Sequence, residues 1–524
     1  MAKVNLIQLG GKLDLNYLYQ LHIDQFFDFN FIKKSEMNIK IIKGKPLFDK
    51  NNQLNSVYKN AVFILDRTSE FLKKRSILQQ LPANRTIVEE HSSIDPELYT
   101  LFNLRNYSFL DFDKNLTKKL IDCFIVKPIG TKFGMKDIYF TDTFKGDITL
   151  NGNESVSFDG TGRAEAIKVM GWAMNIFYDD DTNMEFYPEC RVSTPKSELI
   201  FKVQIFKLDD TLENTITVTK TKYNLVKPTL IHFEKQGYMY VSVYIKGAGK
   251  AKFSIGQCHV LPYRHGKGDL SFGGEAITDT NYLNGRILFN FDAGDMKPPL
   301  NVYFGGFNRG DFFEGYGMLK KMGSPFILVS DTRLIGGAFY IGSQELENKL
   351  IDFISKKLAL LHFSEDQLIL AGLSMGTFGA LYYASSLHPR AVVIGKPLLN
   401  IGNIALNEKV NRPGGFPESL DLLLMRNCDF SVNNATSLNE KFWKKFKNGD
   451  FSKTIFVIAY MKQDDYDSKA FLEISNYLKS EQLNVKIIHK GLIGRHNDNT
   501  SGIVEFFAKQ WENLLDDLYK NNFY

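Results

Sequence analysis

Long apolar runs are missing from this chain of 524 residues. The longest clean run, Ile455–Tyr460, is far shorter than the roughly 18 residues that a helix needs to cross a bilayer. Between Met1 and Leu18 the apolar residues are interrupted by Gly10, Gly11 and Asp14, which breaks the core that a signal peptide requires. We therefore expect neither a membrane span nor a secretory signal.

Cysteine is scarce, and dense blocks of basic residues are absent. The four cysteines are scattered without a CxxC pair, at positions Cys123, Cys190, Cys258 and Cys428. This spacing predicts reduced thiols in a cytoplasmic protein rather than a disulfide framework or a metal site. The formal net charge of +5 is slight for a chain of this length. Nucleic acid is therefore not an expected partner.

The composition that remains is typical of a globular protein. Hydrophobic residues make up 44% of the chain and charged residues 23%, so packed cores are well supplied. The length exceeds what one compact core supports, which predicts two or three domains. The pattern of apolar and polar residues changes twice along the chain. We predict a small α/β or α+β region at 1–135, a β-sandwich-like domain at 136–270 and an α/β domain at 271–524.

The middle part carries short alternating runs punctuated by Asn, Asp, Gly and Pro. The clearest strand candidates are Asp147–Leu150, Leu199–Phe206, Thr215–Thr219 and Tyr238–Ile245. Alternation of this kind at short intervals predicts an antiparallel β-sandwich. Such a domain could bind a carbohydrate or a protein partner, or it could serve a structural purpose only. The residue types do not separate these alternatives.

From residue 271 onward, apolar strands alternate with amphipathic helices. The strand candidates are Ile287–Phe291, Val302–Phe304, Phe326–Val329, Leu368–Ala371, Ala391–Ile394, Thr454–Tyr460 and Val485–His489. The helix candidates are Glu345–Leu361, Thr377–Ser386, Ser468–Ser480 and Gly502–Tyr519. Strands that are apolar along their whole length predict a mainly parallel sheet covered by helices on both faces.

One strand candidate leads directly into the pattern G-x-S-x-G. The pattern reads Gly372-Leu373-Ser374-Met375-Gly376, and a helix candidate rich in small residues follows it. In α/β-hydrolases this sharp strand-to-helix turn exposes the serine hydroxyl, and small flanking residues let the strand and the helix approach each other. We therefore predict an α/β-hydrolase-like fold for 271–524, with Ser374 as the nucleophile. The alternative is a glycine-bounded turn with an idle serine.

A serine hydroxyl needs a base, because it is a poor nucleophile at neutral pH. In this fold the chain order is serine, acid, histidine, and the histidine lies in a loop before the last helix. His496 fits this position and is the predicted base. His489 lies within a strand candidate, and His362 and His388 break the expected order.

The acid is expected directly after a late strand, where an acidic cluster follows Thr454–Met461. Asp464 is the first candidate, Asp465 the second and Asp467 the third. The same cluster is also what a solvated loop would carry, so the choice among the three stays open.

Two backbone N–H groups are needed to stabilise an oxyanion. Met375, at the start of the helix after the serine, supplies one of them. Gly305 and Gly306 follow an early strand candidate and are the candidates for the other, because glycine lets backbone approach a ligand closely. An ordinary glycine turn is the alternative.

A further segment, Asp331–Gly342, follows a strand candidate at the sheet edge where ligands bind in α/β folds. Arg333 and Tyr340 are therefore candidates for binding substrate. A surface loop with an aromatic plug explains these residues equally well.

Four segments resemble the second accessory secretory protein family of the Gram-positive accessory Sec system. They are Glu314–Lys320, Pro325–Ser343, Gly372–Gly379 and Tyr460–Asp467, which read EGYGMLK, PFILVSDTRLIGGAFYIGS, GLSMGTFG and YMKQDDYD. The first 265 residues match that family only by architecture.

The resemblance implies a role in exporting serine-rich-repeat glycoprotein adhesins, together with the first and third accessory secretory proteins and an accessory motor ATPase. It also implies O-acetylation of N-acetylglucosamine on the adhesin, in the cytoplasm or at the inner face of the membrane, with no bound cofactor and an unidentified acetyl donor. When the family's catalytic residues are matched to this chain, the resemblance implies that the nucleophile is Ser374, the base His496 and the acid Asp464 or Asp465. Some family members use Glu as the acid, and this chain has only Asp there. The alternatives are a non-catalytic export adaptor and a carbohydrate esterase.

Overall fold

The computed structural model describes residues 3–11, 23–32, 39–247, 249–427, 429–481 and 485–520. Cys428 and residues 12–18 of the N-terminal segment, on which two of the predictions above rest, lie outside these ranges. The other three cysteines are buried free thiols. No helix within these ranges is both long enough and apolar enough to cross a membrane.

The N-terminal region forms a five-stranded sheet that is parallel throughout, in the order β2-β1-β3-β4-β5. Its strands are β1 (Val4–Leu9), β2 (Phe27–Ile32), β3 (Val62–Leu65), β4 (Thr86–Glu89) and β5 (Ser108–Leu110), and its helices are α2 (Ile23–Phe26), α3 (Arg75–Leu78), α4 (Tyr99–Arg105) and α5 (Leu116–Phe124). Apolar clusters cover both faces of the sheet, as all-parallel sheets require. This region is therefore α/β, one of the two predicted alternatives.

The middle of the chain forms two antiparallel sheets that enclose one apolar core. One sheet contains β7 (Ile138–Phe140), β10 (Ile167–Trp172), β11 (Ile176–Tyr178), β13 (Ser197–Lys207), β14 (Leu212–Lys220) and β16 (Gly237–Gly247). The other contains β6 (Ile129–Phe133), β8 (Gly146–Asn151), β9 (Ser155–Gly162), β12 (Thr182–Val192), β15 (Thr229–Phe233), β17 (Gly249–Pro262) and β21 (Asp311–Phe312).

These two sheets contain all four of the strands predicted for this part of the chain, in β8, β13, β14 and β16. Two strands come from outside the predicted bounds of this domain, 136–270. β6 lies in the stretch that was assigned to the N-terminal region. β21 comes from the part assigned to the next domain and pairs antiparallel with β6. A two-residue strand carries no periodicity that a sequence reading could detect, and its pairing joins the two parts of the molecule.

The C-terminal part is built on an eight-stranded sheet in the order β18-β19-β22-β20-β23-β24-β25-β26. β18 and β19 are antiparallel to their neighbours, and every other pairing is parallel. The strands are β18 (Gly274–Thr278), β19 (Arg286–Asp292), β20 (Leu300–Phe304), β22 (Phe326–Asp331), β23 (Leu368–Leu373), β24 (Ala391–Gly395), β25 (Ile455–Met461) and β26 (Lys486–Leu492).

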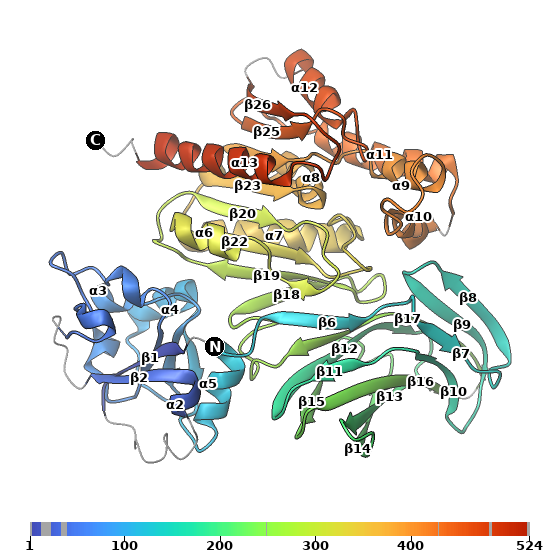
Figure 1. Cartoon of the computed structure of the whole chain (residues 1–524), viewed down its shortest axis with the longest axis horizontal. Coiled ribbons are helices and arrows are strands. Elements are labelled where there is room, and N and C mark those ends of the chain that lie inside the picture. The colour runs from blue at the N-terminus through green and yellow to red at the C-terminus, as the bar shows by residue number, and fades with distance from the viewer. Residues whose placement is uncertain are drawn as a thin grey trace.

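Helices cover both faces of this sheet (Figure 1). They are α6 (Tyr316–Met322), α7 (Gln344–Leu361), α8 (Met375–Leu387), α9 (Ile401–Val410), α10 (Ser419–Asn427), α11 (Val432–Phe446), α12 (Ala470–Glu481) and α13 (Thr500–Leu515), followed by a π-helical turn at Asp516–Lys520. Buried side chains of α7, α8 and α11 pack on one face, and those of α6 and α13 pack on the other. The mainly parallel, doubly covered sheet confirms the fold class predicted for this part of the chain.

Candidate active site

Ser374 lies at the turn between β23 and α8, at the carboxyl edge of the parallel sheet. Its backbone has φ 52° and ψ −118°, a conformation that a non-glycine residue adopts only under strain. Close packing explains the flanking glycines. A Cβ on Gly376 would lie 2.0 Å from the Phe304 carbonyl oxygen, and one on Gly372 would lie 2.3 Å from the Gly376 carbonyl oxygen. The chain can therefore form this strained turn because Gly372 and Gly376 have no side chains to clash with the neighbouring carbonyl oxygens.

His496 is brought beside this serine by the loop between β26 and α13. The Ser374 hydroxyl oxygen is 2.8 Å from His496 Nε2. On the other side of the ring, Nδ1 is 2.8 Å from Asp464 Oδ2. With the ring proton on Nδ1, the imidazole donates to the carboxylate and accepts from the serine hydroxyl. The histidine is only 1% exposed, so its ring is held in this orientation by its surroundings.

The two adjacent aspartates after β25 have different partners. Burial disfavours the charged Asp464, but His496 and the N–H groups of Tyr466 and Asp467 hold the pKa of this carboxyl below its usual value. The Asp465 carboxylate instead accepts the backbone N–H of His496 at 3.0 Å and pairs with Arg412 at 2.7 Å. Asp464 therefore orients the imidazole, and Asp465 holds the loop that carries it.

The third acidic candidate, Asp467, points away from the histidine. Its carboxylate accepts the backbone N–H groups of Leu399 and Asn400, both at 2.8 Å. It therefore joins the loop after β25 to the segment that follows β24.

The rival histidines lie elsewhere. His489 is an exposed residue of β26. His362 and His388 are the C-terminal caps of α7 and α8, each in a left-handed backbone conformation. Within the described residues, none of the three forms a hydrogen bond with Ser374.

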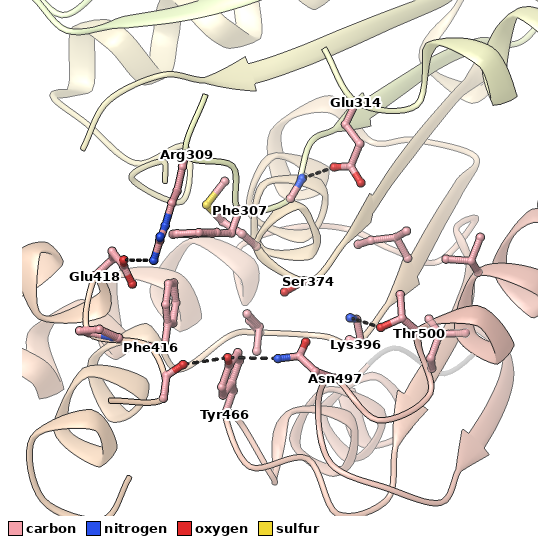
Figure 2. Close-up of a pocket in the computed structure, with 18 of the residues that line it drawn as sticks. Phe307, Arg309, Glu314, Ser374, Lys396, Phe416, Glu418, Tyr466, Asn497 and Thr500 are labelled. Atoms are coloured by element: carbon pink, nitrogen blue, oxygen red, sulfur yellow. Dashed lines mark hydrogen bonds and ion pairs between the residues drawn. The ribbon is translucent and has the colours of Figure 1, made fainter. Parts of the chain in front are cut away.

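A pocket of about 490 Å³ opens over the Ser374 hydroxyl, which lies near its centre in Figure 2. Its wall combines apolar rings with a few charged and polar groups, from Phe307, Arg309, Glu314, Lys396, Phe416, Glu418, Tyr466, Asn497 and Thr500 among others. A concave apolar site with a few convergent polar groups is the usual form of a small-molecule site.

The segment 411–418, between α9 and α10, forms one wall of the pocket. Arg412 pairs with Asp465, and the Tyr466 hydroxyl donates to the Gly415 carbonyl at 3.2 Å. Glu418 accepts from Arg309 at 3.2 Å, and this pair is visible in Figure 2. These contacts fix the segment at both ends, so the wall is held against the serine.

Tyr466 also supports the histidine directly. Its ring stacks on the His496 ring, with the centroids 4.3 Å apart and an interplanar angle of 24°. Phe416 stacks on Tyr466 in turn, and the Arg412 guanidinium lies over the Tyr466 ring at 4.1 Å. This stack packs the imidazole between the wall segment and the acidic loop.

The glycine loop after β20 differs from the prediction. The N–H of Gly305 donates to the Val329 carbonyl at 3.0 Å, because the hydrogen bonding of the sheet continues through it. The N–H of Gly306 donates to Glu314 Oε2 at 2.6 Å. The next amide is that of Phe307, which, like Met375, lines the pocket. Across the described ranges, neither the Phe307 N–H nor the Met375 N–H has a hydrogen-bond partner.

Arg333 and Tyr340 do not line the pocket, contrary to the prediction that they bind substrate. Arg333 is 4% exposed and forms two hydrogen bonds to the Asp331 carboxylate, at 2.8 and 2.7 Å. The Tyr340 hydroxyl is buried and donates to the Gly305 carbonyl at 2.6 Å. Tyr340 therefore supports the glycine loop from behind, whereas Arg333 holds the Asp331 carboxylate, which also accepts the backbone N–H groups of Ala338 and Tyr340.

Lys396 is the main charged residue that the sequence reading missed. It follows β24, adopts a positive φ of 58° and is 6% exposed. Its amine donates to the Thr500 hydroxyl at 3.1 Å, and both residues line the pocket. Burial lowers the pKa of Lys396, while the charges of Asp464 and Glu314 oppose this shift. Its position at the end of a parallel strand is the one signal that could have identified it.

Comparisons with known proteins agree with one another. The family model described as "Accessory Sec system GspB-transporter" matches residues 4–521. An accessory Sec system protein from Staphylococcus aureus is 36% identical over 391 residues, which is 74% of each chain. Its counterpart from Streptococcus gordonii is 33% identical over 421 residues, 79% of this chain and 81% of that one.

A solved structure resembles almost the whole molecule. The Glycosylation Associate Protein (Gap123) complex from Streptococcus agalactiae contains a chain that is 29% identical, with a TM-score of 0.82 over 98% of this chain and 99% of that chain. The match of the family model to nearly every residue identifies the family. The chain belongs to the accessory Sec system GspB-transporter family, the second accessory secretory protein family, whose members take part in export.

Proposed function

We propose that this accessory Sec protein transfers acetyl groups from a donor to sugar hydroxyls of a serine-rich-repeat glycoprotein before that glycoprotein is exported. The observation that carries the proposal is the continuous hydrogen-bonded chain from the Ser374 hydroxyl through His496 to Asp464. This arrangement activates a serine for acyl transfer on several unrelated folds. The sugar acceptor, N-acetylglucosamine, follows from the family resemblance.

In the first half-reaction, His496 Nε2 takes the proton of the Ser374 hydroxyl as the serine oxygen attacks the acetyl carbon of the donor. The ionised Asp464 stabilises the imidazolium that forms. Met375 and Phe307 line the pocket, and their N–H groups are the proposed donors to the oxyanion of the tetrahedral intermediate. The intermediate collapses, and the donor's leaving group departs with the proton from His496.

In the second half-reaction, a sugar hydroxyl attacks the acetyl-serine. His496 removes the hydroxyl proton and returns it to the Ser374 oxygen as the ester passes to the sugar. The apolar rings of Phe307 and Phe416, which pack edge to face at 5.3 Å, support transfer over hydrolysis because they limit the access of water. These steps use no metal and no resident cofactor, since the donor enters as a co-substrate.

The same protein is proposed to work within an assembly. Its similarity to a chain of the Gap123 complex supports binding to the first and third accessory secretory proteins. The accessory motor ATPase and the glycoprotein substrate are the further proposed partners. We place the reaction in the cytoplasm, with the assembly at the inner face of the membrane during export.

Ser374→Ala separates the enzymatic role from the export role. In cells carrying this variant, we expect glycoprotein acetylation to fall at least about 10³-fold while export continues. Reaction of purified protein with a fluorophosphonate probe checks the nucleophile directly, with Ser364→Ala as a matched control because Ser364 lies before β23 on the surface. Unchanged acetylation in the Ser374→Ala strain would leave only the role of a non-catalytic export adaptor. Hydrolysis of acetylated sugars without transfer would assign a carbohydrate esterase instead.

A further inference from the structure

The two sheets of the β-sandwich differ in what covers their outer faces. The sheet that contains β12 and β17 packs against the C-terminal part, where the Tyr187 hydroxyl donates to the Asn284 carbonyl at 2.6 Å and His259 contacts Asp311. The sheet that contains β13 and β16 faces away from that part of the molecule (Figure 1). Its outward positions carry aromatic side chains, among them Tyr240, which is 38% exposed.

A groove of about 410 Å³ crosses this open face. Both aromatic and polar side chains line it, contributed mainly by β7, β13 and β16: Tyr139, Gln204, Phe206, Asp210, Tyr240 and Ser242. The groove shares none of its lining residues with the pocket over Ser374. It is therefore a separate site.

Tyr139 lies flat across the neighbouring strand β10. It is in register with Gly171, and a Cβ on that glycine would lie 2.5 Å from the tyrosine hydroxyl oxygen. Only a glycine leaves room for the ring there. Lys168 donates to the same hydroxyl at 2.8 Å, and its amine is 5.0 Å from the ring centroid. The ring is 40% exposed, so it presents a fixed aromatic face to solvent.

Tyr240 forms a second fixed wall. Its hydroxyl accepts from the Asn175 side chain at 2.9 Å. The Phe206 ring packs edge to face against it, with centroids 5.5 Å apart and an interplanar angle of 89°. Rings held in this way lose little conformational entropy when a ligand binds.

Polar side chains also line the groove, and among the described residues none of them has a side-chain hydrogen bond to the protein. Ser242 is 5% exposed, and within the described residues its hydroxyl has no hydrogen-bond partner. The side chains of Gln204 and Asp210 likewise have none there. These side chains are open to the groove and are not sealed from solvent, so their polar atoms are available to exchange hydrogen bonds with the hydroxyl groups of a ligand.

We propose that this groove binds a pyranose ring of a glycan. The apolar C–H face of a pyranose stacks on a flat tyrosine ring, and its hydroxyl groups exchange hydrogen bonds with Gln204, Ser242 and Asp210. Among the described residues that line the groove, Asp210 alone is charged, and its negative charge disfavours phosphate and other anions. The site does not depend on acetyl transfer at Ser374. It would hold a glycan on a part of the protein that has no catalytic residues.

Binding to the full-length protein tests this site. N,N′,N″-triacetylchitotriose and short oligomers of glucose and galactose are titrated by calorimetry and by ligand-observed NMR. We expect at least one of these sugars to bind, and Tyr139→Ala to weaken its binding at least about tenfold. Gln204→Ala should weaken it severalfold. Tyr223→Ala is the matched control, because this tyrosine is 80% exposed and lies outside the groove.

Ser374→Ala should leave sugar binding at the groove unchanged, which keeps this result independent of the proposed acetyl transfer. Circular dichroism and thermal unfolding of each variant verify that it is folded. Failure of every sugar to bind would overturn the proposal, and so would equal affinities for the wild type and Tyr139→Ala. If Tyr139→Ala instead abolished capture of the other accessory secretory proteins without affecting sugar binding, the face would be a protein interface and the proposal would be wrong.

Discussion

Two buried histidines in this molecule pair with an aspartate in nearly the same way. His496 Nδ1 lies 2.8 Å from Asp464, and His259 Nδ1 lies 2.7 Å from Asp311. Each histidine is 1% exposed. The first pair lies at the carboxyl edge of the parallel sheet, and the second lies between the β-sandwich and the C-terminal part.

The two sites differ in the group that faces the other ring nitrogen of the histidine, Nε2. His496 Nε2 faces the Ser374 hydroxyl beneath a pocket, whereas His259 Nε2 faces the Glu189 carboxylate at 3.3 Å. Burial opposes the charged ring, but Asp311 and Glu189 raise the pKa of His259 above its usual value. Lys132 adds a cation 3.4 Å from Asp311. A histidine–aspartate pair therefore supports catalysis only where the free nitrogen meets a nucleophile that substrate can reach.

The largest expected effect falls on the first pair. Asp464→Asn should lower kcat by about 10³–10⁴-fold, because an amide neither fixes the Nδ1–H tautomer nor stabilises the imidazolium. Release of acetate from a chromogenic acetyl ester measures this loss. The matched control is Asp465→Asn, which keeps an acceptor for the His496 N–H and should cost less than about tenfold. Equal losses in the two variants would contradict the assignment of Asp464 as the acid.

Disruption of the second pair, His259 with Asp311, should lower folding stability and leave turnover nearly unchanged. His259→Ala leaves the buried Asp311 and Glu189 carboxylates without their shared partner, which should cost about 3–5 kcal/mol of folding free energy. Chemical denaturation monitors the loss, and kcat per active site, titrated with the fluorophosphonate probe, should stay within about threefold. A large fall in kcat with unchanged stability would mean that this site takes part in catalysis. His489→Ala, on an exposed strand position, is the control.

The stabilising effect of the His259 pair also has a defined pH dependence. A raised pKa in the folded state means that the native protein binds the proton more tightly than the unfolded chain. The contribution is therefore complete below the ordinary histidine pKa and is lost as pH rises through the folded value. Comparing the unfolding of wild type and His259→Ala at several pH values should show their difference shrink as pH rises.

A smaller effect on folding stability is expected at Glu154, near the same interface, where substitution should stabilise the protein. Burial, with repulsion from Glu189 and Asp421, raises the pKa of Glu154 to about 8. The unfolded chain releases this proton near pH 4.5, so the native state loses stability as pH rises from there through about 8. Glu154→Gln removes the ionisation and should stabilise the protein by roughly 2–4 kcal/mol at pH 8, with little change at pH 4. A stabilisation that did not depend on pH would contradict this origin.

The smallest effect is expected at the ring that stacks on His496. Tyr466→Phe keeps the stacking at 4.3 Å and loses the two hydrogen bonds of the hydroxyl, which donates to the Gly415 carbonyl and accepts from the Asn497 side chain. We expect kcat to fall less than about threefold, because the imidazole stays in place. Tyr466→Ala, which removes the ring, should have the larger effect. Identical values for the two variants would show that the stacking does not position the histidine.

Much of this arrangement could be predicted from the sequence, because periodicity and glycine spacing are local signals. The apolar strands, the elbow at Ser374 and the histidine before the last helix all followed from chain order. The choice of Asp464 over Asp465 could not be made in this way. Two adjacent side chains in a loop point in directions that depend on how that loop packs against segment 411–418.

The remaining differences also come from contacts that a linear pattern does not contain. Gly305 was predicted to have a free N–H, but the hydrogen bonding of β20 continues through it to Val329. Arg333 was predicted to face a ligand, but Asp331 occupies its guanidinium. Phe416, far along the chain from the elbow, reaches the pocket only through the insertion between α9 and α10.

Mass spectrometry of the acid-quenched enzyme tests the proposed nucleophile most directly. The protein is mixed with an activated acetyl ester, quenched within milliseconds to seconds, and digested for peptide mapping. We predict a single acetyl group on the peptide that contains Ser374. This group should be lost when the sugar acceptor is added before the quench, and it should be absent from Ser374→Ala. Turnover of the ester by an enzyme whose acetyl group appears on another residue, or undiminished turnover by Ser374→Ala, would contradict this prediction.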